Sequence, residues 1–415
     1  MARTKATLGD GVRLTDYLGA SLLARVYPLE LVESVLQEHC VQSQRVRSFP
    51  APVTTYYCMA LALYPQAAYE AVFAAVAQGL ASVHGSIAPR TVVKSAISTA
   101  RTRLGSAPLK TLHARACKPL ASPKAQPHAF YAGLRLVAID GSVFDIPDEV
   151  ANAQHFGRHK AAGTTSGNTS GTTSGKPSGN VASYPQARCV LLAECATHAI
   201  IDAQLGASTQ SENALAQPIL ERLQPDMLCL ADRGFCGYPN WRKATASGAQ
   251  LLWRCKTDWQ LPVEHMLEDG SYLTTLYPDQ KSRRAGTGAV KVRVIEYDLP
   301  QQRGAQERYR LITTLLDAKK APALELATLY RERWEIESVL DELKTHTLER
   351  RRTLRSKTPQ GINQEFYGWL LMHYATCWLM HQAASAHRLK QRDLSFTGTL
   401  HLVRRQQPHS GAFPP

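Results

Sequence analysis

Four residues between positions 330 and 344 combine residue types and a spacing that suit phosphoryl chemistry. Tyr330, Arg333, Glu337 and Lys344 are separated by two, three and six residues. On a helix that turns about 100° per residue, all four side chains fall within one narrow stripe. A carboxylate held in such a stripe can bind a metal ion, and the two cations beside it can hold a phosphate. The alternative is an amphipathic helix on which Arg333 and Glu337 form an ordinary i, i+4 ion pair.

The segment that carries this stripe is predicted to be one long helix. Pro322 can occupy its first turn, and neither Gly nor Pro follows before Pro359. The apolar side chains fall on a single face that would pack on the core, and they are Leu329, Ile336, Val339, Leu340 and Leu343. Glu335 and Glu342 point away from the stripe and from this apolar face, so we expect them to be solvated.

The elements that must position the stripe change from helical to strand-like near residue 134. Short apolar runs predict strands at 134–139, 189–194, 199–205, 227–231 and 250–256. Ser211 is predicted to cap a helix after the third strand, and residues around 241–247 are predicted to form another helix. Together with the helix of the stripe, this order is that of the ribonuclease H-like fold, an α/β fold with a mixed sheet flanked by helices. His198 lies in the turn between the second and third strands and is expected to be exposed.

Two aspartates follow the first and the fourth of these strands. Asp140 comes after LRLVAI, and Asp232 comes after MLCLA. In a ribonuclease H-like sheet these two strands are parallel neighbours, so both carboxylates would meet Glu337 at one point. Carboxylate oxygens suit Mg²⁺ or Mn²⁺, and two such ions can hold the attacking and leaving oxygens of a phosphoryl transfer. Taken singly, Asp140 could begin a turn at Gly141, and Asp232 could cap the turn that follows it.

Composition and periodicity divide the chain into five predicted segments. They are a helical N-terminal domain (1–125), the first part of a catalytic domain (126–256), a β-rich insertion (257–316), the second part of the catalytic domain with C-terminal helices (317–390) and a basic tail (391–415). A Gly, Ser and Thr tract at 163–179 is predicted to be a surface loop. The run from Lys94 to Lys118 holds six Lys and Arg residues and no acidic one. A helix-turn-helix-like DNA binder and a small basic bundle both fit this run.

The overall composition is that of a globular protein with an anionic partner. Of the 415 residues, 44% are hydrophobic and 20% are charged, and the net charge is +14 with a pI of about 9.4. Nucleic acid is the obvious partner for this charge. The nine cysteines form no CxxC pair, which favours reduced, buried thiols. No apolar signal segment opens the chain, and the apolar helix at 366–380 is too short to span a bilayer. We therefore expect a soluble intracellular protein without a membrane partner.

These motifs together resemble the IS4-type family of DDE transposases. The resemblance rests on the Tyr-Arg-Glu-Lys spacing, on Asp140-Gly141-Ser142, on DRGF at 232–235 and on LRSKTP at 354–359. It implies that Asp140, Asp232 and Glu337 are the catalytic residues and the ligands of two Mg²⁺ or Mn²⁺ ions. It also implies DNA contacts by one set of aromatic and basic residues, which are Tyr330, Arg333, Lys344, Arg351, Arg352, Arg355 and Lys357.

The resemblance also implies a reaction and its partners. A transposase of this family cuts double-stranded DNA at the terminal inverted repeats of an insertion sequence, passes through a hairpin intermediate and joins the freed end to target DNA. The implied assembly is a homodimer on the DNA ends, in the bacterial cytoplasm at the nucleoid, with the N-terminal region on the ends. Two alternatives stay open: a structure-specific nuclease that cuts without joining, and a DNA-binding copy without catalysis.

Overall fold

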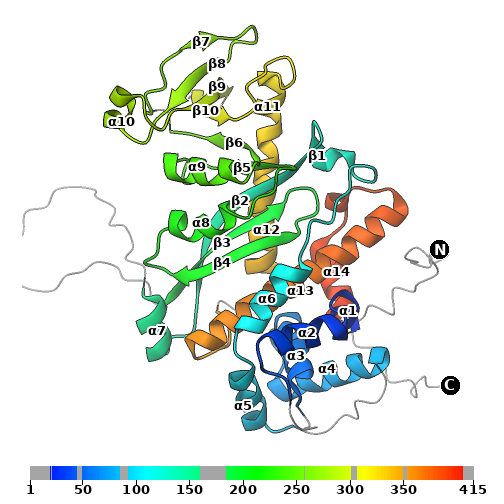
Figure 1. Ribbon diagram of the computed structural model, residues 1–415. Helices are drawn as coiled ribbons and strands as arrows, with labels where there is room; N and C mark the ends of the chain where they lie inside the picture. The colour runs from blue at the N-terminus through cyan, green and yellow to red at the C-terminus, as the bar shows by residue number, and fades with distance from the viewer. Residues whose placement is uncertain are drawn as a thin grey trace, which may run out of the picture.

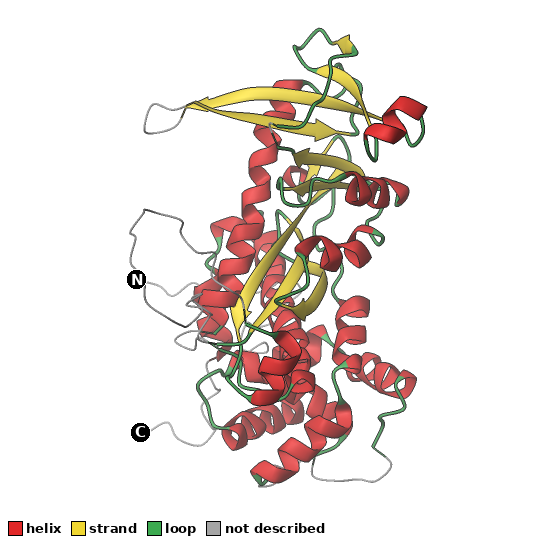
Figure 2. Ribbon diagram, turned by 90° about the vertical axis from the view of Figure 1, so that its left-hand side faces the viewer, coloured by secondary structure: helices red, strands yellow, loops and turns green. Residues whose placement is uncertain are grey.

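The computed structural model describes residues 19, 21–43, 49–84, 92–158, 184–256, 258–300, 306–348 and 353–404. One mixed sheet runs through the centre of the described residues, with strand order β4-β3-β2-β5-β6-β10-β9-β8-β7 and with the short β1 (Phe130–Tyr131) paired to β2. Figure 2 shows the strands between helices on both sides. The predicted class, a mixed sheet flanked by helices, is confirmed.

The first half of the sheet has the predicted ribonuclease H-like order. Strands β2, β3 and β4 are antiparallel neighbours, whereas β5 pairs parallel with β2 and β6 pairs parallel with β5. Their bounds are β2 (Leu134–Asp145), β3 (Gln186–Glu194), β4 (Ile200–Ala207), β5 (Met227–Ala231) and β6 (Gln250–Arg254). Helix α8 (Glu212–Leu220) connects β4 to β5, and helix α9 (Tyr238–Ala246) connects β5 to β6. The first and fourth strands are therefore parallel neighbours, as predicted.

Strand β2 is longer than the predicted strand at 134–139. Its parallel pairing with β5 ends at Ile139 opposite Ala231, but its antiparallel pairing with β3 continues to Asp145 opposite Gln186. Asp140 therefore lies inside a strand and not in a turn after it. The extension could not be predicted from the sequence, because DGSVFD lacks a continuous apolar run and most of this part of the strand is only partly buried.

The insertion continues the same sheet. Strand β10 (Gln306–Thr313) pairs antiparallel with β6, and β9 (Val290–Pro300), β8 (Tyr272–Leu276) and β7 (His265–Met266) follow in order. The helix α10 (Gln280–Ala285) lies between β8 and β9 in sequence. Strands β7 to β10 therefore all lie within the predicted insertion at 257–316. The segment is thus rich in strands, as expected, and it forms the far edge of the central sheet (Figure 1).

The N-terminal helices pack around one long C-terminal helix. They are α1 (Ser21–Val26), α2 (Leu29–Glu38), α3 (Ala51–Leu63), α4 (Tyr69–His84), α5 (Lys94–Leu104) and α6 (Ala107–Ala116), and α13 (Pro359–His387) lies against α1, α3, α5 and α6. Buried residues of these helices belong to the same hydrophobic cluster as β2 and α13. The helical character predicted for this region is present, but residue 125 does not separate two cores.

Further elements complete the described chain. The short helix α7 (Val150–Phe156) follows β2, and α14 (Phe396–Arg404) packs on α13 with Leu400 and Val403 buried. Part of the predicted basic tail is therefore a helix, because its apolar residues recur at helical spacing. The tract at 163–179 lies outside the described residues. All nine cysteines are free, and all but Cys40 are buried. None of the helices in the described ranges is both long and apolar enough to cross a membrane.

The contact between α13 and α3 generates a prediction about Gly368. A methyl group at this position would lie 2.6 Å from the Cys58 carbonyl oxygen, a backbone atom that cannot turn aside. Gly→Ala inside a helix is normally stabilising by about 0.5–1 kcal/mol. At this site we expect Gly368→Ala to lower the free energy of unfolding by about 1–3 kcal/mol instead, because it overpacks the contact.

Urea unfolding of the full chain measures this effect. Gly398→Ala is the control, since its new methyl meets only the Ser395 side chain, at 3.2 Å, and should leave stability unchanged or raise it. A rise in stability for Gly368→Ala would show that the two helices can move apart without cost.

Candidate active site

The end of the parallel β2–β5 pairing places two carboxylates side by side. Asp140 and Asp232 directly follow Ile139 and Ala231, the last paired residues of the two strands. The Gly141 N–H donates to Asp140 Oδ1 (2.7 Å), and the Gly234 N–H donates to Asp232 Oδ1 (2.8 Å). Each carboxylate is thus oriented by its own local backbone, and both residues are only partly exposed.

The helical segment contributes a third carboxylate and a cation. Arg333 Nη2 lies 2.9 Å from Glu337 Oε1, and Arg333 Nη1 lies 3.8 Å from Asp140 Oδ2. The Arg333 guanidinium is nearly buried, whereas the Glu337 side chain is 45% exposed. One guanidinium therefore links the predicted strand carboxylate to the predicted helix carboxylate.

The segment that carries these residues is not one regular helix. It runs as α11 (Ala323–Leu329), a 3₁₀ stretch (Tyr330–Trp334), α12 (Glu335–Asp341) and a π-helical turn (Glu342–Thr347). In a 3₁₀ helix, side chains three residues apart are eclipsed, so Tyr330 and Arg333 lie one above the other. The winding therefore changes along the segment, which a helical wheel does not show.

Tyr330 occupies a different place from the one predicted. Its ring is buried, and its hydroxyl donates to the Ala231 carbonyl oxygen (3.0 Å). The hydroxyl thereby ties the helical segment to the end of β5, directly before Asp232. Only 3% of Tyr330 is exposed, so little of its surface is open to solvent, and its contact with DNA stays a prediction.

The predicted basic residues divide into those at the site and those away from it. Lys344 is exposed, and its Nζ lies 3.1 Å from the Ser142 hydroxyl, two residues after Asp140. Arg355 donates to the Ala67 carbonyl oxygen (2.9 Å), and exposed Lys357 pairs with Glu149 (2.7 Å). Of the predicted basic residues that the structure describes, Lys344 and Arg333 lie beside the carboxylates. Arg351 and Arg352 lie outside the described residues.

Burial and neighbouring negative charges both raise the pKa of the Asp140 carboxyl group. Burial, together with the negative charges of Asp232 and Glu212, raises the pKa of Asp140 to about 6, although the Gly141 N–H and Arg333 oppose the shift. Such crowding of carboxylates around one guanidinium leaves an excess of negative charge. Oxygen donors in this arrangement fit Mg²⁺ or Mn²⁺, which would offset that charge. Asp140, Asp232 and Glu337 are the residues that would hold such ions.

Glu212 is a residue of this site that the sequence reasoning missed. It is the first residue of α8, capped by Ser211, and its side chain lies directly over Gly141. The signal available was a glutamate at the start of the helix that connects the third and fourth strands. Nothing in the sequence showed that this helix end faces Asp140.

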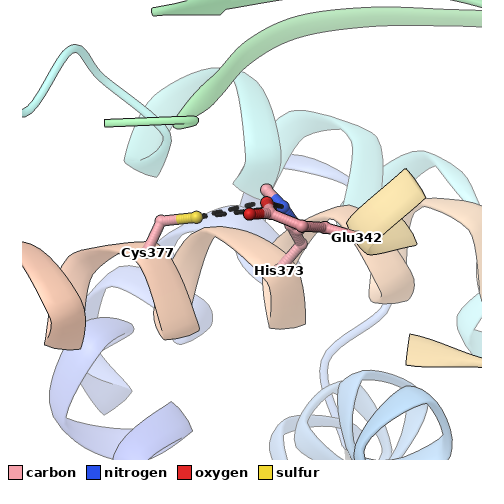
Figure 3. Close-up of side chains that lie close together, drawn as sticks. All are labelled: Glu342, His373 and Cys377. Carbon is pink, nitrogen blue, oxygen red and sulfur yellow. Dashed lines mark hydrogen bonds and ion pairs between the residues drawn. The ribbon is translucent and has the colours of Figure 1, made fainter. Parts of the chain in front are cut away.

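The opposite side of the same helical segment carries a second charged group. His198 Nε2 lies 2.9 Å from Glu335 Oε2, and His198 Nδ1 lies 2.8 Å from Glu342 Oε1. Glu342 Oε2 in turn lies 2.8 Å from His373 Nε2 on α13 (Figure 3). The predictions that Glu335 and Glu342 are solvated and that His198 is exposed are therefore wrong. Each side chain is polar, but each has a partner that lies far away in the sequence.

Proton positions in this group follow from the contacts. Burial alone would lower the pKa of His198, but hydrogen bonds with Glu335 and Glu342 raise it to about 10. Burial would raise the pKa of Glu342, but its bonds to His198 and His373 lower it to about 2. A histidine with a carboxylate on each ring nitrogen is an imidazolium, and it joins the β3–β4 turn to both ends of α12.

Glu342, His373 and Cys377 also have the residue types of a zinc site. Their ligand atoms lie within 4.8 Å of one another, and all three residues are buried. Two ligands of a tetrahedral zinc ion are roughly 3.3 Å apart when their bonds are about 2.0 Å long. The 2.8 Å between Glu342 Oε2 and His373 Nε2 is instead a hydrogen-bond distance. This group is therefore better described as a polar network than as a metal centre.

Two family models match the sequence that forms this fold and site. The model described as insertion element 4 transposase N-terminal matches residues 18–114, and the model described as transposase DDE domain matches residues 131–374, more than half of the chain. The chain belongs to the IS4 family of DDE transposases. It is accordingly a transposase of an insertion sequence, an enzyme that acts on DNA, and the predicted family is confirmed.

Individual relatives agree with this assignment. Transposase InsG for insertion sequence element IS4 from Escherichia coli K12 is 27% identical over 83% of this chain and 73% of its own length. Putative transposase y4zB from Sinorhizobium fredii is 24% identical over 51% of this chain and 55% of its own length. A solved structure, the piggyBac transposase synaptic complex with hairpin DNA, aligns at 11% identity with a TM-score of 0.43, over 94% of this chain and 79% of that one.

The His198 network generates a prediction about stability and pH. His198→Gln leaves buried Glu342 and partly buried Glu335 without the cation that joins them, so we expect a loss of about 3–5 kcal/mol in the free energy of unfolding. The pKa of His198 is raised from 6.5 to about 10, so its stabilisation is complete below pH 6.5 and is lost as the pH rises through about 10. The pKa of Glu342 is lowered from 4.5 to about 2, so its contribution is complete above pH 4.5.

Urea unfolding from about pH 5 to about pH 10 measures the difference between wild type and His198→Gln. We expect the difference to be largest between pH 4.5 and pH 6.5 and to shrink toward pH 10. His346→Gln is the control, because His346 is partly exposed and pairs with exposed Asp341. A difference that is the same at every pH would assign His198 a neutral packing role.

Proposed function

We propose that this transposase cuts and joins DNA by metal-dependent phosphoryl transfer at Asp140, Asp232 and Glu337. The observation that carries the proposal is the meeting of the three carboxylates: two at the end of the β2–β5 pairing, and one linked to Asp140 through Arg333. When bound there, two Mg²⁺ or Mn²⁺ ions supply Lewis-acid polarisation of the scissile phosphate and of the attacking hydroxyl.

The surrounding residues would bind and orient the DNA. Arg333 and Lys344 provide the cations that hold phosphate oxygens beside the carboxylates, because both lie within reach of the β2 segment at 140–142. Tyr330 would act on DNA only indirectly, by fixing the end of β5 before Asp232. Glu337 keeps part of its carboxyl group toward solvent, where substrate would approach.

A basic cleft away from the carboxylates supports a further DNA contact. It has a volume of about 380 Å³, lies between α5 and the start of α13 and is lined by Lys94, Arg101, Arg355 and Lys357. We assign this cleft to the sugar–phosphate backbone, since clustered cations bind DNA without reading its sequence. Arg351 and Arg352, in the same basic run of the sequence, are proposed to bind DNA as well.

The wider reaction follows the family. We infer that the N-terminal helices bind the terminal inverted repeats, that a homodimer assembles on two DNA ends at the nucleoid, and that cleavage passes through a hairpin before strand transfer to target DNA. The full set of carboxylates at one point favours catalysis over an inactive copy. A nuclease that cuts without joining differs from this proposal by forming no strand-transfer product.

Nearly isosteric changes test the carboxylates. We expect Asp140→Asn, Asp232→Asn and Glu337→Gln each to abolish cleavage of an end substrate in Mg²⁺ and to leave DNA binding nearly unchanged, because each removes metal-binding charge and little volume. Gel-shift and cleavage assays on the same preparations measure both effects. Nicking by Glu337→Gln at the wild-type rate would remove Glu337 from the catalytic set.

A second test separates phosphate binding from helix stabilisation. If Arg333 and Lys344 hold phosphates, Arg333→Ala and Lys344→Ala should each slow single-turnover cleavage of pre-bound DNA by about tenfold or more, equivalent to about 1.4 kcal/mol. Arg331→Ala is the control, because Arg331 is exposed on another face of the same stretch. Equal rates in all three variants would contradict the phosphate contacts and leave Glu337 as the only reactive residue of the segment.

A further inference from the structure

The start of α8 brings a fourth acidic side chain to Asp140. Ser211 caps this helix by accepting the Ala214 N–H (3.1 Å), which fixes Glu212 as its first residue. Strand β3 pairs with β2, and β4 pairs with β3, so the helix that follows β4 begins near the strand segment that holds Asp140. Glu212 is partly buried in this position.

The contact between Glu212 and Gly141 is unusually close. A Cβ atom at residue 141 would lie 2.7 Å from Glu212 Cδ, 2.8 Å from Cγ and 2.9 Å from Oε1. Gly141 does not have a positive φ angle, so its backbone conformation is open to any amino acid. Glycine at 141 is therefore explained by space: it leaves room for the Glu212 carboxyl group against the peptide that follows Asp140.

The Glu212 carboxylate adds negative charge beside Asp140, and no described residue pairs with it. Within the described part of the chain it makes no hydrogen bond or ion pair, although the charges of Asp140 and Asp232 are close by. A glutamate in the first turn does interact favourably with the helix dipole. A side chain turned toward solvent would gain the same interaction, however, so the dipole does not explain why Glu212 leans over Gly141. Among the residues that the structure describes, Glu212 has no cation partner that would explain its position.

We propose that Glu212 is a further carboxylate ligand of the divalent ions bound at Asp140, in addition to Asp232 and Glu337. This inference rests on the proposed metal-dependent function. Three carboxylates beside the positively charged Arg333 guanidinium carry less negative charge than two divalent ions carry positive charge. A fourth anionic oxygen donor would reduce this difference. Gly141 would then be a positioning residue that keeps the path between Glu212 and Asp140 open.

Mn²⁺ binding to the full-length protein without DNA tests the proposal, with free Mn²⁺ followed by its electron paramagnetic resonance signal. We expect Glu212→Gln to weaken Mn²⁺ binding by about tenfold or more, as Asp140→Asn and Glu337→Gln should. Glu221→Gln is the matched control, because Glu221 lies at the other end of α8 and pairs with Lys243. Circular dichroism establishes that every variant is folded.

A double-mutant cycle tests the contact itself. Gly141→Ala should weaken Mn²⁺ binding in the wild type by displacing Glu212, and it should have no further effect in the Glu212→Ala background. An equal loss in both backgrounds would mean that the methyl group disturbs Asp140 directly, and Gly141 would lose its assigned role.

The outcomes also distinguish this inference from the proposed function. If Asp140→Asn and Glu337→Gln weaken Mn²⁺ binding but Glu212→Gln and Glu212→Ala do not, the role of Glu212 is overturned and the three-carboxylate site stands. If none of these variants changes Mn²⁺ binding, the metal site itself is wrong and the inference fails with it.

Discussion

The helical segment at 323–347 carries acidic side chains on two sides, and a separate buried cation holds each side. Arg333 pairs with Glu337 near Asp140, and His198 joins Glu335 to Glu342. Unpaired charges at such depth are costly, so each cation restricts how the segment can turn or slide. The position of Glu337 relative to the sheet therefore depends on a pair of contacts on opposite sides of one short stretch.

The support for this arrangement extends to the N-terminal helices. Glu342 contacts His373 on α13, and α13 is packed against α1, α3, α5 and α6. Gly368, in the middle of α13, allows close approach to the backbone of α3. The helices of the first 125 residues thus have a structural role in addition to the DNA-binding role proposed for them, because they fix the helix against which the segment with Glu337 rests.

Much of this structure could be predicted from the sequence because periodicity reports burial. Apolar runs identified the strands before Asp140 and Asp232, and helical spacing identified the face with Ile336 and Val339, which is buried. The changes from 3₁₀ to α to π winding could not be predicted, since they occur where the segment makes contacts with residues far away in the sequence, such as the Tyr330 hydroxyl bond to the end of β5. The partners of buried polar residues were also hidden, because the wheel assigns every polar side chain off the apolar face to solvent.

Three glutamates within eight residues show how the fold separates similar side chains. Residue type cannot distinguish Glu337 from Glu335 and Glu342, and all three lie on the same short segment. Glu335 and Glu342 are both bound to His198, and Glu342 is buried as well. Glu337 has a cation shared with Asp140 and keeps nearly half of its side chain exposed. A carboxylate that must receive a metal ion and face DNA needs that exposure, so tertiary contacts and not local sequence favour Glu337.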